Sequence, residues 1–478
     1  MKYASVLIAV LALISLWRCQ KDFVTGRSTF SLLSEADEVA MGRSSHDSVI
    51  AEYGTYQDDN LQSWLEQRGQ KVAGVSHRSQ LEYHFYVVDS PVVNAFALPG
   101  GYVYFTRGIL AHFNSEAEMM GVLGHEVGHV VARHGAEQYS RVTMAQIGLG
   151  LASALSEEFR KYSMFAELGT TLLFLKFSRN QESESDRLGV QYATSLGYDG
   201  HKMADFFETI DRISASSGQS LPGFLSTHPN PANRRDTIHA MVRDMESQGF
   251  KPTIAATRDD YLKRINGMAF GDDPAFGYTE QGILYAPHWR LMFKPKSSVD
   301  VQKQRQAVQM SIAEGQAVVI FSVDDEHKTA EESMRAFAQK TQLNPGGATP
   351  ADIGPIRASM LRGDVASQGA NLSVVAYFFT HNNMVFQAYG FADKTQFASM
   401  EPEIQSALQS AQVLNDASAL NRKSARLRVK SAPKTGTLRD NLAALHVAQQ
   451  DMEMHALINA AQLEDRIERG YSLKVVVH

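Results

Sequence analysis

Two histidines four residues apart, with a glutamate beside the first, are the residues of this sequence that most directly imply chemistry. His125, Glu126 and His129 lie in the segment MMGVLGHEVGHVVARHG, residues 119–135. On a helix, residues at this spacing project from one face, so both imidazoles can bind one Zn²⁺ ion. Zinc lowers the pKa of a water that it binds to about 7, and the adjacent carboxylate can accept the proton. The spacing therefore predicts a hydrolytic metal site; the alternative is a pair of solvated histidines.

A zinc site of this kind needs a third protein ligand, and an acidic segment downstream offers one. In FSRNQESESDRLGVQYA, residues 177–193, Glu182, Asp186 and Gly189 recur at helical spacing and share a face. We predict that Glu182 is the third ligand and that Asp186 accepts the other N–H of a ligand histidine. Glu184 lies about 200° around the helix from Glu182 and faces elsewhere. The alternative is that this acidic run is a solvated helix face.

A third histidine from the first segment is not expected at the metal. The extended zinc-protease pattern requires a histidine where this chain has Gly135. His134 is one position away, about 140° around a continuous helix from His129. We therefore place His134 at the end of the helix, near the negative end of its dipole.

Helices must carry these side chains, and a small sheet must lie beside them. Gly124 and Gly128 would destabilise the first helix unless another element packed closely against it, which predicts close contact with the acidic helix. The apolar helix expected to end at Phe177 contains charged residues, which favours a core helix over a membrane span. The patterns predict helices at 115–134, 144–155, 159–177, 181–196 and 232–248, and strands at 81–89 and 100–108.

Composition limits the remaining possibilities. The chain has 478 residues, of which 44% are hydrophobic and 21% charged, and its net charge is −6. This balance is typical of a globular protein and gives no basic surface for nucleic acid, which we exclude as a partner. The single cysteine, Cys19, rules out an internal disulfide and leaves histidines and carboxylates as the metal ligands.

The N-terminus is typical of an exported protein. Lys2 precedes an apolar run over residues 6–17, the length of a signal peptide rather than of a membrane span. Cys19 follows this run as in a bacterial lipoprotein signal, although Trp17 and Arg18 stand where small residues are typical. We predict a signal peptide at residues 1–19, a periplasmic location, and Cys19 as the candidate for lipid attachment to the outer membrane.

Beyond about residue 273 the sequence pattern changes from mainly helical to mainly strand-forming. Alternating apolar residues predict strands at 317–323 and 358–365, a hairpin over 373–392, and a helix over 397–414. We interpret residues 276–415 as an α+β domain without a catalytic motif.

Three motifs together resemble the CAAX-prenyl-endopeptidase-like gluzincin metallopeptidases, especially the soluble envelope members of HtpX and BepA type. The resemblance covers about residues 24–275, the expected metallopeptidase domain. Its motifs are HEVGH (125–129), SRNQESESD (178–186) and HPNPANR (228–234), supported by the similar segments 24–42 and 93–110.

The resemblance implies an α+β fold with a mainly helical zinc domain and a small edge sheet. It makes His125, His129 and Glu182 the zinc ligands and Glu126 the general base. His228 and Arg234 would lie over the site and stabilise the oxyanion. Alternatively, His228 binds the zinc and holds the enzyme latent, or is an ordinary loop histidine.

The resemblance also implies a place for the substrate. An extended peptide would add to an edge strand that includes Asn94, Ala95, Phe96 and Ala97. The Met-rich helices around residues 144–177 would line or cap the cleft.

The C-terminal segment 426–478 resembles a degenerate LysM module. The similarity lies in VKSAPKTGTLRDNLAAL (429–445) and INAAQLEDRIERGYSLKVV (458–476). It implies either glycan binding or a purely structural βααβ unit.

These observations predict an exported zinc-dependent endopeptidase, one Zn²⁺ per chain, that hydrolyses unfolded or misassembled cell-envelope proteins. Two other functions stay open. One is a latent or inactive chaperone-like binding protein; the other is a peptidoglycan-associated adaptor that acts through residues 426–478.

Overall fold

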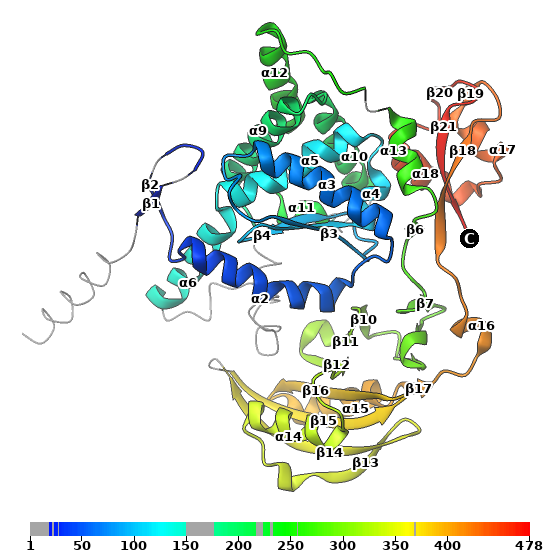
Figure 1. Cartoon of the computed structure of the whole chain (residues 1–478). Helices are drawn as coiled ribbons and strands as arrows, with labels where there is room; N and C mark the ends of the chain where they lie inside the picture. The colour runs from blue at the N-terminus through cyan, green and yellow to red at the C-terminus, as the bar shows by residue number, and fades with distance from the viewer. Residues whose placement is uncertain are drawn as a thin grey trace, which may run out of the picture. The chain divides into compact units, whose positions relative to one another are not determined.

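The computed structural model divides the chain into two compact units. Residues 1–271 and 425–478 form the first, and residues 272–424 form the second (Figure 1). The structure describes residues 19–21, 23–26, 28–149, 176–216, 223–229, 233–255, 257–367 and 370–478. The expected signal peptide and the helix predicted at 159–177 therefore fall almost wholly outside the described residues.

The first unit is a helical body with a small mixed sheet, as the α+β prediction requires. β3 runs parallel to β5, and β4 pairs antiparallel with β5, in the order β3-β5-β4. α2 packs on one face of this sheet, whereas α3 and α5 pack on the other (Figure 1). The elements are β1 (Cys19–Lys21), β2 (Ser28–Phe30), α2 (Glu35–Tyr53), α3 (Asp59–Val75), β3 (His84–Val88), β4 (Ala95–Leu98), β5 (Tyr102–Thr106), α4 (Arg107–His112), α5 (Glu116–Val131), α6 (His134–Leu149), α9 (Arg179–Ser195), α10 (His201–Ser216), α11 (Gly223–Thr227), α12 (Arg234–Ser247) and α13 (Arg258–Ile265).

The two helices that carry the predicted site pack closely, as their glycines suggested. A Cβ added to Gly124 of α5 would lie 2.9 Å from the main-chain oxygen of Gly189 in α9. Ser115 and Ser178 cap these helices, each accepting a hydrogen bond from a main-chain N–H in the first turn. The prediction of close contact is confirmed.

The C-terminal segment belongs to the first unit. β18 (Ala425–Ser431) pairs with β6 (Ala269–Phe270) on one side and with β21 (Ser472–Val477) on the other. Lys474 is buried and donates to the main-chain oxygens of Ala111 and Phe113, at 2.8 Å each. Between the long strands lie β19 (Gly436–Thr437), α17 (Leu438–Ala444), η4 (Gln449–Asp451), α18 (Met452–Ile458) and β20 (Arg466–Ile467). The segment thus has the order ββααββ, and a strand pair and the buried Lys474 side chain attach it to the helical body.

The second unit is built on a seven-stranded antiparallel sheet in the order β10-β11-β12-β16-β15-β14-β13. The predicted strands at 317–323 and 358–365 and the hairpin are confirmed. The predicted helix at 397–414 is too long: α15 ends at Leu408, and Ala411–Val413 form β17, because these residues pair with β9. The elements are β7 (Tyr278–Glu280), β8 (Ile283–Ala286), η1 (Pro287–Trp289), β9 (Leu291–Phe293), β10 (Asp300–Lys303), β11 (Ala307–Ile312), η2 (Ala313–Gly315), β12 (Ala317–Val323), α14 (Ala330–Thr341), η3 (Pro345–Gly347), β13 (Thr349–Ile353), β14 (Ile356–Ser367), β15 (Ala370–His381), β16 (Met384–Asp393), α15 (Phe397–Leu408), β17 (Ala411–Val413) and α16 (Ala417–Leu420).

Across the described ranges, no helix combines the length and hydropathy needed to cross a membrane.

Candidate metal centre

Four side chains from three segments meet in the interior of the first unit. His125 and His129 of α5, Glu182 of α9 and His228, which follows α11, each offer a donor atom, and these atoms lie within 4.8 Å of one another. The Nε2 atoms of the two α5 histidines are 3.0 Å apart. Glu182 Oε1 lies 3.4 Å from His129 Nε2 and 3.0 Å from His228 Nδ1. The four residues are at most 2% exposed.

This donor set fits a zinc ion. Two imidazoles with a carboxylate are a known catalytic zinc ligand set, and His228 adds a fourth donor atom, an imidazole nitrogen. Glu182 Oε2 is buried without a hydrogen-bond partner among the described residues, as are both carboxylate oxygens of Glu126. Buried polar atoms without partners are costly, and a cation among these donors would remove part of that cost.

The charges at the cluster are strongly coupled. Burial raises the pKa of Glu182, but the nearby His228 and His129 outweigh this effect and hold the pKa well below its usual range. Burial lowers the pKa of His129 well below its ordinary value. For His228, burial lowers the pKa, but Glu182 and Glu126 oppose it, and the net shift is upward. The cluster therefore favours an ionised Glu182 and a neutral His129, the forms in which both can bind a metal.

The Nδ1 atom of His125 is held by the buried ion pair of Asp186 and Arg234. Its Nδ1–H donates to Asp186 Oδ1 at 2.9 Å. Arg234, the first residue of α12, binds both oxygens of Asp186 at 2.6 and 2.8 Å, and its guanidinium lies 3.6 Å from the ring centre of Phe207. This arrangement leaves His125 Nε2 facing the donor cluster. In this conformation Arg234 thus contacts Asp186, and its oxyanion role stays a prediction.

Glu126 lies beside the donor cluster. Its side chain is fully buried, and its Oε1 lies 3.8 Å from His228 Nε2. Burial raises the pKa of Glu126. Within the described part of the chain neither oxygen of this carboxylate has a hydrogen-bond partner, so Glu126 is free to accept a proton from a reacting group.

His228 reaches the cluster because its loop is fixed from two sides. Phe224 accepts a main-chain hydrogen bond from His228, at 2.8 Å, and its ring stacks on the imidazole with centroids 4.4 Å apart. Phe224 also donates its N–H to Val93, and Phe177 donates to Thr227. The loop is thereby bonded both to the residues before β4 and to those before α9.

Comparison with known proteins agrees with this geometry. Residues 59–242 match the profile of peptidase family M48. Over this range the chain is similar to peptidase family M48. The predicted resemblance to gluzincin metallopeptidases, which use zinc, is thus confirmed for a domain that contains His125, His129, Glu182 and His228.

Individual relatives match between 44 and 52% of this chain. The mitochondrial metalloendopeptidase OMA1 of Arabidopsis thaliana is 31% identical over 214 residues, which are 44% of this chain and 42% of that protein. OMA1 of Schizosaccharomyces pombe is 31% identical over 44% of this chain and 63% of that protein. The beta-barrel assembly-enhancing protease of Yersinia pestis is 29% identical over 52% of each chain. The matches thus span 42 to 63% of these relatives.

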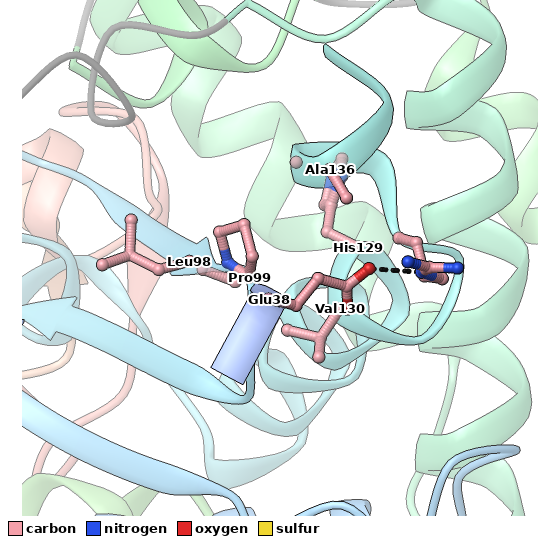
Figure 2. Close-up of a pocket in the computed structure, with 9 residues that line it drawn as sticks. Glu38, Leu98, Pro99, His129, Val130 and Ala136 are labelled. Carbon is pink, nitrogen blue, oxygen red and sulfur yellow. Dashed lines mark hydrogen bonds and ion pairs between the residues drawn. The ribbon is translucent and has the colours of Figure 1, made fainter. Parts of the chain in front are cut away.

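The predicted edge strand lies next to the metal centre of the M48 domain. Ala95, Phe96 and Ala97 belong to β4, and Asn94 directly precedes it; β4 occupies one edge of the sheet. A cavity of about 10 Å³ separates the end of β4 from α5 (Figure 2). Its lining consists of Glu38, Ala97, Leu98, Pro99, His129, Val130, Arg133, Gly135 and Ala136. One metal-cluster histidine therefore borders the strand on which a peptide is expected to lie.

A buried ion network that no local sequence pattern predicted borders this cavity. Glu38 of α2 pairs with Arg133 and, at 3.1 Å, with Arg78. All three residues are buried. Arg133 also donates to the main-chain oxygen of Leu33 at 2.7 Å. The acid-rich start of α2 was visible in the sequence, but its arginine partners are 40 and 95 residues away and no local pattern indicates them.

The placement of His134 was wrong. α5 ends at Val131, and Arg133 adopts a left-handed conformation with φ 59°, so the helix is broken. His134 begins α6 and turns back toward α5, where its Nδ1 lies 3.0 Å from His129 Nδ1. The extrapolation of a continuous helix failed because it assumed ordinary helical dihedrals at Arg133.

Proposed function

We propose that this protein is a zinc-dependent endopeptidase. The observation that carries this proposal is the set of four buried donor atoms within 4.8 Å of one another. Beside them lies the carboxylate of Glu126, which has no hydrogen-bond partner among the described residues. We assign His125, His129 and Glu182 to the zinc, and Glu126 to proton transfer. The match to peptidase family M48 supports this assignment.

We assign a separate role in peptide hydrolysis to β4, Glu126 and Asp186. Zinc, when bound, polarises the peptide carbonyl and lowers the pKa of water at the site to about 7. The edge of β4 binds the peptide in extended form through main-chain hydrogen bonds. Glu126 takes a proton from the attacking water on a carboxylate oxygen and delivers it to the leaving nitrogen. Asp186 holds His125 in the tautomer whose Nε2 is free to bind.

The variant Glu126→Gln tests this proposal, because it removes the base while keeping the shape of the side chain. We expect cleavage of an unfolded protein such as casein to fall by about 10²- to 10⁴-fold, with the zinc content unchanged. Glu208→Gln is the matched control, since Glu208 is a half-exposed residue of α10 that pairs with Arg235. The proposal is wrong if zinc-loaded Glu126→Gln cleaves as fast as this control.

We propose further that His228 closes the site as an additional zinc ligand in the resting enzyme. Support comes from its Nδ1, which lies 3.0 Å from Glu182 Oε1 and 3.4 Å from His125 Nε2. His228→Ala should then increase the rate of cleavage while the zinc affinity falls. A decrease in cleavage at full zinc occupancy would instead assign His228 to stabilisation of the oxyanion, together with Arg234.

We also propose that the substrates are unfolded or misassembled proteins of the cell envelope and that the protein is periplasmic. The similarity to a beta-barrel assembly-enhancing protease supports both statements. Cys19 as a lipid anchor and residues 426–478 as a peptidoglycan-binding unit belong to the same proposal. Capture of bound proteins by Glu126→Gln identifies substrates, mass spectrometry of the intact protein tests lipidation, and co-sedimentation of the full chain with purified sacculi tests glycan binding. An unlipidated chain that stays in the supernatant would refute the last two.

A further inference from the structure

The two α5 histidines of the metal cluster are held in different ways. The Nδ1 of His125 meets a carboxylate, that of Asp186. The Nδ1 of His129 instead meets another imidazole, that of His134, at 3.0 Å. Metal-binding histidines need a partner at the nitrogen that does not bind the metal, because this partner fixes the tautomer and the ring orientation.

The His134 side chain is buried in the interior of the first unit. Its side chain is 2% exposed, and its Nε2 lies 3.4 Å from Glu184 Oε2. Ser185 Oγ lies 3.3 Å from the same Nδ1 that meets His129. On the other side of His129, the ring of Phe177 packs with its centroid 4.0 Å away. The His129 ring is therefore restrained both at its Nδ1 and on its face.

The hydrogen bonds from His129 through His134 to Glu184 can be donated in only one direction. If His129 keeps the lone pair of Nε2 for the metal cluster, its Nδ1 carries the proton and donates to His134 Nδ1. His134 then carries its own proton on Nε2, which points to Glu184. A carboxylate only accepts, so Glu184 completes the series, and its pKa is lowered first of all by the hydrogen bond with His134.

We infer that His134, backed by Glu184, is a positioning residue that fixes the tautomer and orientation of His129 for zinc binding. This inference rests on the proposed function and extends it to residues outside the ligand set. Glu184 thus has a role distinct from that of Glu182, two residues earlier on the same helix. Asp186 and Arg234 serve His125, whereas His134 and Glu184 serve His129.

Zinc affinity, measured by competition with a chromophoric chelator, tests the inference without any use of cleavage. His134→Phe keeps the ring but removes the acceptor, and we expect the affinity to fall by about 10- to 100-fold. His134→Asn keeps an oxygen acceptor near the place of Nδ1 and should lose less. His455→Phe is the control, because His455 is equally buried and accepts from the N–H of Val476, far from the cluster in sequence. This control should lower stability and leave zinc affinity unchanged.

The absorption spectrum of the Co²⁺-substituted protein supplies a second measurement, since its d–d bands depend on ligand geometry. The bands should change in His134→Phe and not in His455→Phe. If His134→Phe does not fold, Glu184→Gln decides, because it removes only a partly exposed charge and should still weaken zinc binding. Wild-type affinity and spectrum in the folded variant would overturn the inference. A wild-type protein that binds zinc but cleaves nothing would refute the proposed function alone.

Discussion

The contact between α5 and α9 makes a quantitative prediction for Gly189→Ala. Gly189 of α9 faces the main chain of α5. A Cβ added there would lie 2.9 Å from the main-chain oxygen of Gly121 and 3.0 Å from the nitrogen of His125. Both neighbours are main-chain atoms, so neither can move without moving α5.

The size of the effect follows from these distances. Ordinary contacts of a Cβ begin at 3.4 Å, so the helices would have to separate by about 0.5 Å. Overpacking of this kind costs about 1–3 kcal/mol, offset by about 0.5–1 kcal/mol from replacing a helical glycine. The shift moves Glu182 and Asp186 relative to His125. Because a misplacement of about 1 Å can cost about 10²-fold in rate, we expect kcat/KM to fall about tenfold.

Gly74→Ala provides the matched control. Gly74 lies in α3, and a Cβ added there would meet no atom within 4 Å. This variant gains only helix propensity and should become about 0.5–1 kcal/mol more stable. Denaturant unfolding of both variants, with and without zinc, isolates the overpacking cost as their difference. If Gly189→Ala were as stable and as active as Gly74→Ala, the argument for close packing at the metal centre would be wrong.

Three further perturbations probe the same unit. Lys474→Met removes a buried amine that donates to two main-chain oxygens, so denaturant titration should show the free energy of unfolding reduced by about 1–3 kcal/mol for each oxygen left without a donor; a total loss under about 1 kcal/mol would contradict this role. Asp186→Asn deprives His125 of its charged acceptor and should weaken zinc binding about 10- to 100-fold in chelator competition, a prediction that unchanged affinity refutes. Burial lowers the pKa of His112 from 6.5 to about 4, so its contribution to stability is complete above pH 6.5 and is lost as the pH falls toward 4. His112→Asn should therefore flatten the fall in unfolding free energy between pH 7 and pH 4.5, and an unchanged slope would exclude this cause.

Local spacing was enough to predict the core of the metal centre. His125 and His129 needed only the helical period, because both stand on one face of one helix. Glu182 and Asp186 were predicted from the stripe they form with Gly189, which also indicated that α9 approaches α5 closely. These are properties of single helices, and tertiary packing preserved them.

Features that depend on distant segments could not be predicted in this way. The turn that places His134 beside His129 depends on the left-handed conformation of Arg133, and Glu38 of α2 binds that arginine. A pattern within residues 119–135 contains no information about this partner. The end of α15 follows the same rule, since Ala411–Val413 leave the helical pattern only because β9 offers them a strand partner.

The distribution of unsatisfied polar atoms is the strongest physical sign that this centre is kept for chemistry. Among the described residues, eight buried side-chain atoms have no hydrogen-bond partner, and five of them belong to Glu126, Glu182, His228 and Arg234. A sixth, Asn94 Oδ1, lies at the start of the predicted edge strand. Each such atom costs about 1–3 kcal/mol, and apolar residues of similar shape would avoid that cost. This cost in folding free energy is concentrated where a metal and a peptide would supply the missing hydrogen-bond partners. By contrast, the buried amine of Lys474 donates to the main-chain oxygens of both Ala111 and Phe113.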